Sequence, residues 1–479
     1  MSETQDPQQT PPPPEAWEPA RRLAQRVTRP GERFMQVQAS SGILLLAMAV
    51  IALVWANSPW AESYEHLWET PFSIALGSWS MERSLHFWIN DLLMAIFLLV
   101  VGLEVKRELV EGALSDIKRA ALPLAAAVGG MLVPAILYGT LNAGGPGASG
   151  WGVPMATDIA FAVGILTLLG DRVPATLRVV LLALAIIDDI GAILIIALFY
   201  SSGIDLSALW WIGGAIFTTL GLHGMGIRPG LIFVFPGIVL WGGMLQLGVH
   251  PTIAGVIVGL MTPVRPWYGK EGFLRAAQKA LDDFKSKVAR PDHDDHELEE
   301  PLRRLARARN EALSPAKRIE TWLHPWVAFG IMPLFALANA GVNLGGVELS
   351  DGTSLTVFLG ITLGLVVGKP LGILGVSWIS VRLGWSVLPP GVTWGGFFVV
   401  GAAAGIGFTM AIFIGELAFA RDLIGVGKLG VLVGTAVSSA IALGAGLLIL
   451  KVDKRKSGEQ VTLTDAETMT QYWTGERPS

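Results

Sequence analysis

About twelve long apolar segments run through the chain, and they constrain its fold more than any other feature. A helix needs roughly 20 mainly apolar residues to cross the hydrocarbon core of a bilayer. The seventh and eighth segments are the least clearly separated, because only Gly242, Gly243 and Gly248 divide them. The sequence therefore predicts an all-α polytopic membrane protein. The segments cover residues 41–58, 86–105, 120–141, 151–169, 175–199, 206–222, 229–245, 247–264, 322–342, 355–380, 394–419 and 427–451.

Composition agrees with a membrane protein and excludes several other classes. Hydrophobic residues make up 52% of the chain and charged residues only 15%, against roughly 25% charged residues in soluble domains. The net charge of -4 gives no reason to expect a nucleic-acid partner. Because the chain has no cysteine, it can form neither disulfides nor thiol-based sites. No cofactor is expected.

Basic residues predict how the segments are oriented. Lys106, Arg107, Lys118 and Arg119 follow the second segment, and further basic residues follow the fourth, sixth, tenth and twelfth. The opposite loops carry few basic residues. Loops rich in Lys and Arg stay in the cytoplasm, so both termini are expected there.

The chain divides into a membrane domain and polar appendages. Residues 40–452 hold the apolar segments, whereas 1–39 and 453–479 are expected to be cytoplasmic tails, the first of them disordered. Residues 266–318 are dense in charge and predict a cytoplasmic insertion of amphipathic helices. Residues 72–83 are too short and polar to span the membrane, and they predict a β-hairpin on the outer face. An exposed hairpin edge can pair with a second copy.

Four ionisable residues lie inside apolar segments. Asp158 belongs to the fourth segment, Asp188 and Asp189 to the fifth, and Lys369 to the tenth. Such groups cost at least a few kcal/mol each at membrane depth and mark functional sites by default. The alternative is that they form structural ion pairs or lie near wetted helix ends.

The adjacent aspartates need not share one ligand. On a helix the side chains of Asp188 and Asp189 project about 100° apart, so one can face a cavity while the other faces a partner. A buried carboxylate can hold either a proton or a hard cation such as Na+, which prefers oxygen ligands. Asp158, Asp189 and the Thr157 hydroxyl would supply such oxygens. Competition of Na+ and H+ for one site is already an exchange mechanism.

The fourth and eleventh segments are both interrupted. Pro154, Thr157 and Asp158 break the fourth, and Gly405 and Gly407 break the eleventh. Glycines also allow close helix packing, which explains the eleventh segment equally well when it is taken alone. The pairing matters, because interrupted helices at corresponding places in two halves mark the ion site of inverted-repeat transporters.

Several short stretches together resemble the NhaA-type sodium/proton antiporters, a family among those on which that rule is based. Besides Asp188 and Asp189, the stretches are 98–109, 156–162, 250–256, 324–327, 338–342, 368–372 and 405–410. They keep a consistent order over about residues 40–452. No single stretch would suffice, but their joint order is highly specific.

The resemblance implies a fold and a role for each site residue. Spans three to five and ten to twelve would be inverted repeats whose broken helices, spans 4 and 11, cross near the membrane centre. Asp189 would be the principal ligand of Na+ and H+, with Thr157 as a further ligand. Asp158 would be a neighbour that also offsets positive helix ends. Lys369 would offset negative helix ends and pair with Asp188 until a proton or an ion binds.

The resemblance also implies a function. The chain would extrude Na+, and also Li+, in exchange for external protons, electrogenically, for sodium and pH homeostasis at a bacterial inner membrane. Glu104, Glu108 and Glu320 would belong to a funnel through which ions enter, or to a pH sensor. Charge pattern alone favours a solvated helix end for the first two. The resemblance likewise implies a homodimer made by the hairpin at residues 72–83. The tails and the insertion at 266–318 exceed the family's core.

The rival functions are an intramembrane protease and a different kind of transporter. An intramembrane metalloprotease needs a His-Glu-x-x-His pattern, which His296 and Glu297 do not complete. An intramembrane aspartyl protease needs two aspartates on separate spans and in local contexts unlike that of Asp188 and Asp189. No enzymatic activity is expected. A sodium-coupled symporter of an organic solute is the alternative transporter, and it would need a larger midplane pocket with groups for that solute.

Overall fold

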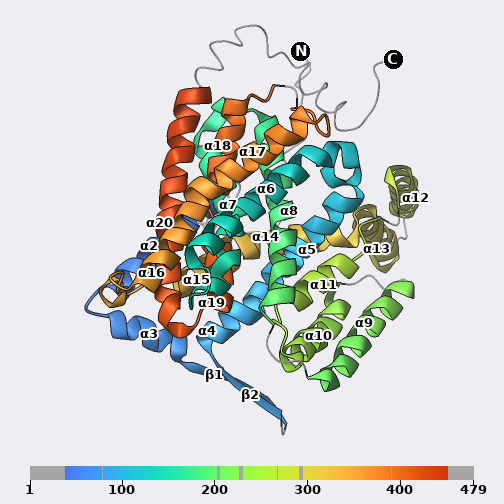
Figure 1. Cartoon of the computed structure of the whole chain (residues 1–479). Helices are drawn as coiled ribbons and strands as arrows, with labels where there is room; N and C mark the ends of the chain where they lie inside the picture. Colours follow the sequence, from blue (N-terminus) through green and yellow to red (C-terminus); the bar gives the residue numbers. More distant parts are fainter. Residues whose placement is uncertain are drawn as a thin grey trace, which may run out of the picture.

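Helices form almost the whole of this computed structural model (Figure 1). It describes residues 38–450 apart from 78, 202–204, 226–229, 267, 291–294 and 390. The tails predicted at 1–39 and 453–479 lie outside the described residues, except for the first two residues of α2 (Gln38–Ala56). The further α-helices are α3 (Ala61–Glu69), α4 (Leu85–Phe87), α5 (Met94–Val110), α6 (Ile117–Asn142), α7 (Ile159–Leu168), α8 (Ala175–Phe199), α9 (Leu209–Gly224), α10 (Val234–Leu247), α11 (Ile253–Met261), α12 (Lys270–Val288), α13 (Asp295–Ala312), α14 (Pro315–Trp326), α15 (Met332–Asn339), α16 (Gly352–Leu363), α17 (Lys369–Arg382), α18 (Trp394–Ala404), α19 (Phe408–Ala418) and α20 (Arg421–Ala445).

Short segments of other helix types extend or join these helices. A 3-10 helix, η3 (Ala148–Met155), precedes α7. π-Helical turns make α4 and α5, α14 and α15, and α16 and α17 continuous, and one more extends α20 to Leu450. Within the described residues, seven continuous helices are long and apolar enough to cross a membrane, and three bent pairs raise the number to ten. The protein is therefore a multi-pass membrane protein.

The seventh and eighth predicted segments differ from the others. They form α10 and α11, which have 14 and 9 residues. At about 1.5 Å per residue each is shorter than the roughly 30 Å hydrocarbon core. Both are buried in part, α10 against α9 around Trp241 and Met244, and α11 against α5. The count of twelve spans thus stays a prediction.

A two-stranded antiparallel sheet projects from the helical body (Figure 1). Strand β1 (Pro71–Leu76) pairs with β2 (Trp79–Ser84), and Phe72 lies opposite Arg83. The side chains of Phe72 and Ile74 are 49% and 41% exposed. The two strands therefore present backbone edges and apolar side chains outside the helical core.

The charged insertion forms two helices at one edge of the bundle, α12 and α13, which pack against each other (Figure 1). The next helix, α14, begins at Pro315, inside the predicted insertion and before the predicted ninth segment at 322–342. Ser314 caps it by accepting a hydrogen bond from the Lys317 N–H at 3.2 Å. Hydropathy misses this start because the first turns of α14 are polar, whereas the Ser-Pro pair is a helix-start signal.

Helix α6 contacts α17 and α8 in different ways. Against α17 it packs backbone to backbone, since a Cβ atom added to Gly372 would lie 2.0 Å from the Gly129 carbonyl oxygen. Against α8 it packs through a side chain, since a Cβ added to Gly191 would lie 2.2 Å from Met131 Sδ. The first contact fixes α17, and with it Lys369, close to α6.

The close contact of α6 and α17 generates a stability prediction. Gly372→Ala should lower the unfolding temperature in detergent, because the helices must separate to admit the methyl group, at a cost of about 1–3 kcal/mol. The matched control is Gly375→Ala on the same helix, where nothing lies within 4 Å of the added Cβ. Equal unfolding temperatures for both variants, followed by tryptophan fluorescence, would contradict the proposed contact.

Candidate functional site

Two helix breaks meet inside the bundle. Helices η3 and α7 are bent by 41° at residues 156–158, and α18 and α19 by 46° at residues 405–407. The Asp158 N–H donates a hydrogen bond to the Ile406 carbonyl at 2.7 Å, which joins the breaks directly. A Cβ on Gly407 would lie 3.1 Å from the Ala156 carbonyl oxygen, so a glycine suits this close approach.

Asp158 lies at the first turn of both α7 and α19. Its Oδ1 accepts the Phe161 N–H at 3.0 Å, which caps α7. Its Oδ2 accepts the Thr409 N–H at 3.1 Å and the Thr409 hydroxyl at 2.5 Å. Helix N-termini carry partial positive charge and unsatisfied N–H groups, so one carboxylate here satisfies two helix ends at once.

Lys369 is fully buried between an aspartate and a helix end. Its Nζ lies 3.0 Å from Asp188 Oδ2 and also donates to the Met155 carbonyl, at the last residue of η3. The Thr157 hydroxyl lies 2.7 Å from the same Asp188 oxygen and 3.0 Å from the Ala404 carbonyl at the end of α18. Since a hydroxyl has one proton, it donates to one of these acceptors at a time and keeps lone pairs for a cation.

Asp189 differs from its neighbour in having no bonded partner. It is 2% exposed, and no described residue makes a hydrogen bond or an ion pair with its carboxylate. Asp188, Asp158 and Lys369 nevertheless interact with it electrostatically, so it belongs to the same charged group. The Oδ1 atom of Asp188 is likewise enclosed and without a hydrogen-bond partner among the described residues. The centre of the bundle therefore holds carboxylate oxygens that no described protein donor satisfies.

The three predicted glutamates lie on α5 and α14. Arg107 Nη1 lies 2.7 Å from both carboxylate oxygens of Glu320, and Arg107 Nη2 lies 3.8 Å from Glu108 Oε1. Lys317 adds a contact of 2.9 Å to Glu320, which is buried. Glu104 makes no hydrogen bond or ion pair with any residue that the structure describes, although Glu320 and Arg107 interact with it electrostatically. The structure thus brings Glu108 and Glu320 together around one arginine.

Sequence reasoning missed one direct partner and one ion pair. Thr409 lies in the interrupted eleventh segment and was not among the predicted site residues, yet it donates twice to Asp158. Glu416 and Lys428, on α19 and α20, form an ion pair of 2.5 Å. Both lie in predicted spans, so the rule that singled out Asp189, an ionisable group at membrane depth, would also have found them.

The different surroundings of the two aspartates generate a prediction. Asp188→Asn should destabilise the protein by about 3–5 kcal/mol, because it leaves the buried Lys369 ammonium without a counter-charge. Asp189→Asn, an identical chemical change one residue away, breaks no bond to a described residue and should unfold near the parent temperature. Adding Lys369→Met to Asp188→Asn should recover much of the loss. Equal shifts in the unfolding temperatures of the two single variants would contradict this assignment.

Comparisons with known proteins show which family the chain belongs to. The sequence model of the Na+/H+ antiporter 1 family matches residues 32–447. A protein of Sorangium cellulosum named Na(+)/H(+) antiporter NhaA 2 is 56% identical over 96% of this chain and 98% of its own length. A protein of the same name from Myxococcus xanthus is 52% identical over 98% of this chain and 100% of its own length. The NhaA antiporter of Janthinobacterium sp. is 53% identical over 90% of this chain and 95% of its own length. These matches do not favour the symporter alternative, and they show that the chain belongs to the Na+/H+ antiporter 1 family.

Proposed function

We propose that this chain exchanges Na+ for H+ across a bacterial inner membrane, with Asp189 as the principal ligand of both ions. The observation that carries the proposal is the Asp189 carboxylate, which is 2% exposed and not hydrogen-bonded by any described residue. A buried ionised carboxylate without a partner is strongly unfavourable. A proton or a sodium ion removes that penalty.

Exchange follows from competition for the Asp189 charge. While Na+ is bound the carboxylate cannot also hold a proton, and protonation removes the charge that attracts Na+. We infer that Asp158 and the lone pairs of Thr157 complete the oxygen ligands that a hard cation requires. Access to the site from alternate sides of the membrane then turns competition into antiport.

The Asp188–Lys369 pair is proposed to respond to the ion. Lys369 lies 3.0 Å from Asp188 and also interacts electrostatically with Asp189. A cation at Asp189 repels the Lys369 ammonium group, so ion binding weakens the ion pair between Lys369 and Asp188. Release of this pair would couple occupancy of Asp189 to the contacts that join η3, α8 and α17.

Finer features of transport belong to the same proposal. Li+ is also a hard cation with a preference for oxygen ligands, so the same site would accept it. External protons would drive electrogenic extrusion of Na+, which serves sodium and pH homeostasis. The basic loops favour cytoplasmic termini. The cluster of Glu104, Glu108 and Glu320 at the ends of α5 and α14 would then line the cytoplasmic funnel for entering cations, or sense pH there.

The Asp189 assignment predicts a loss of exchange without a loss of folding. In inverted membrane vesicles, Asp189→Asn should abolish the proton movement that follows addition of Na+ or Li+, because the amide can neither ionise nor supply the ligand charge. The control is Asp282→Asn on the exposed surface of α12. Near-parent dequenching of a pH-sensitive dye in the Asp189→Asn vesicles would refute the proposed ligand.

The exposed hairpin is proposed to join two copies of the chain. Deleting residues 72–83 should lower the fraction of dimer in detergent yet leave exchange measurable, because no proposed ligand lies on β1 or β2. The fraction of dimer is measured by light scattering during size-exclusion chromatography. Dimers at the parent level after the deletion would mean that association uses another surface.

A further inference from the structure

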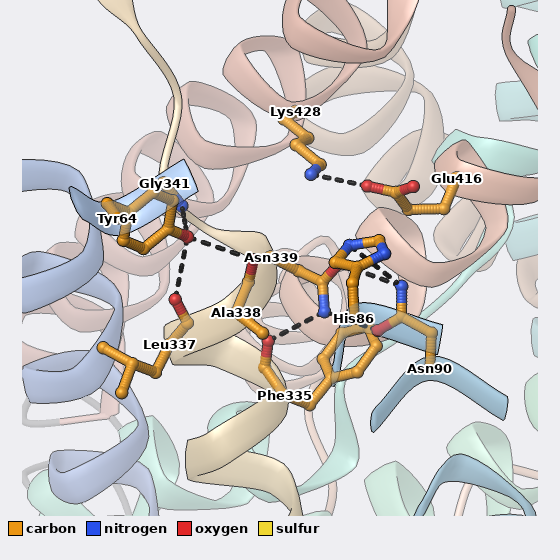
Figure 2. A network of polar contacts seen from close by, with 10 residues as sticks. All are labelled: Tyr64, His86, Asn90, Phe335, Leu337, Ala338, Asn339, Gly341, Glu416 and Lys428. Carbon is orange, nitrogen blue, oxygen red and sulfur yellow. Dashed lines mark hydrogen bonds and ion pairs between the residues drawn. The ribbon is translucent and has the colours of Figure 1, made fainter. Parts of the chain in front are cut away.

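Helix α20 holds α19 at two points. Near the start of α19, the Phe408 N–H donates to the Thr435 hydroxyl oxygen at 3.2 Å. Near its end, Glu416 pairs with Lys428 at 2.5 Å (Figure 2). The points are seven residues apart on α20 and eight on α19, about two helical turns. The two antiparallel helices are therefore fastened at both ends of the shorter one.

The ion pair is partly buried among other polar side chains. The side chains of Glu416 and Lys428 are each 13% exposed. Beside them lies a hydrogen-bonded group of His86, Asn90 and Asn339 (Figure 2). Both the Oδ1 and the Nδ2 atom of Asn339 are hydrogen-bonded to Asn90. His86 interacts electrostatically with Glu416 and Lys428. Lys428 also lines a pocket of about 570 Å³ at this end of the bundle. A charge pair in such surroundings is only weakly screened by salt.

The same short helix also holds the aspartate at the crossing. Thr409, next to Phe408, donates both its N–H and its hydroxyl to Asp158. Helix α19 has only 11 residues, and its buried residues run from Phe408 to Gly415. A displacement of α19 relative to α20 therefore moves the two donors that orient the Asp158 carboxylate.

We propose that Glu416, Lys428 and Thr435 are positioning residues for ion exchange, which fix α19 against α20 so that Thr409 orients Asp158 for the cation. This inference rests on the proposed function, because it assigns Asp158 to the Na+ site. The three residues do not touch the ion. They hold the Asp158 carboxylate in place before Na+ binds, so that binding loses less free energy in ordering this group.

The test separates positioning from general stability. The apparent Na+ affinity and the maximal rate of exchange are measured in vesicles for Glu416→Gln, Lys428→Gln and the double variant. Each single change should raise the Na+ concentration at half-maximal exchange on the order of fivefold. The double variant should show no further change, because either single change already breaks the one ion pair.

Thr435 supplies a second, milder test. Thr435→Val removes the hydroxyl that accepts the Phe408 N–H while keeping the shape of the side chain, so it should fold even if the charge variants do not. It should weaken the apparent Na+ affinity, and Thr435→Ser, which keeps the hydroxyl, should restore it. If Thr435 had a structural role alone, Thr435→Val would lower the unfolding temperature but leave the apparent Na+ affinity unchanged, and Thr435→Ser would have no affinity to restore.

The outcomes distinguish this inference from the proposed function. Glu299→Gln and Arg303→Gln break an exposed pair of 2.8 Å on α13 and serve as controls with parent kinetics. If the parent exchanges Na+ but the Glu416, Lys428 and Thr435→Val variants keep the parent Na+ affinity, the positioning role is wrong and the antiporter stands. If the effects of Glu416→Gln and Lys428→Gln on the apparent Na+ affinity were additive, the two residues would not act through one ion pair, and the positioning role would also be wrong. If the parent itself moves no protons on addition of Na+, the proposed function fails.

Discussion

The structure depends on satisfying broken helix ends inside the membrane. Where η3 and α18 stop and α7 and α19 begin, N–H and C=O groups are left without helical partners, and a bilayer offers no water to bind them. Asp158 accepts hydrogen bonds from N–H groups at the starts of α7 and α19. Lys369 donates to a carbonyl at the end of η3, and the Thr157 hydroxyl lies within hydrogen-bond distance of a carbonyl at the end of α18. The groups that permit the crossing are thus the same groups that surround the proposed ion site. Fold and site cannot be changed independently here.

Asp188 and Asp189 show how one helix gives two identical side chains different surroundings. The turn of about 100° between neighbouring residues directs Asp188 towards Lys369 and Thr157. Asp189 points elsewhere and meets no bonded partner among the described residues. The paired carboxylate contributes to stability because it matches a buried cation. The other is the proposed ligand of Na+ and H+, so stability and the proposed ion binding are assigned to different carboxylates.

Much of this site could be predicted from the sequence, since charged residues in apolar segments are conspicuous and Pro154, Gly405 and Gly407 mark the interruptions. Their contacts could not be predicted from local pattern. The bond between Asp158 and Thr409 joins residues 251 positions apart, and hydropathy carries no information on such pairs. Hydropathy also predicts full spans where α10 and α11 have 14 and 9 residues, because an average over about 20 residues includes the connections that flank each helix. The inverted repeat likewise stays a prediction.

The unequal interfaces of α6 decide where this bundle can deform. Where the backbones of Gly129 and Gly372 are in direct contact, no side chain lies between them, so the contact cannot relax by a change of rotamer at that point. Met131, in contrast, meets Gly191 with an unbranched, flexible side chain that can repack at little cost. At these two points α17 is therefore held against α6 more rigidly than α8 is. Lys369 lies on α17, whereas Asp188 and Asp189 lie on α8. The ion pair of Lys369 and Asp188 therefore joins helices on either side of the α6–α8 interface, the one at which a side chain can repack.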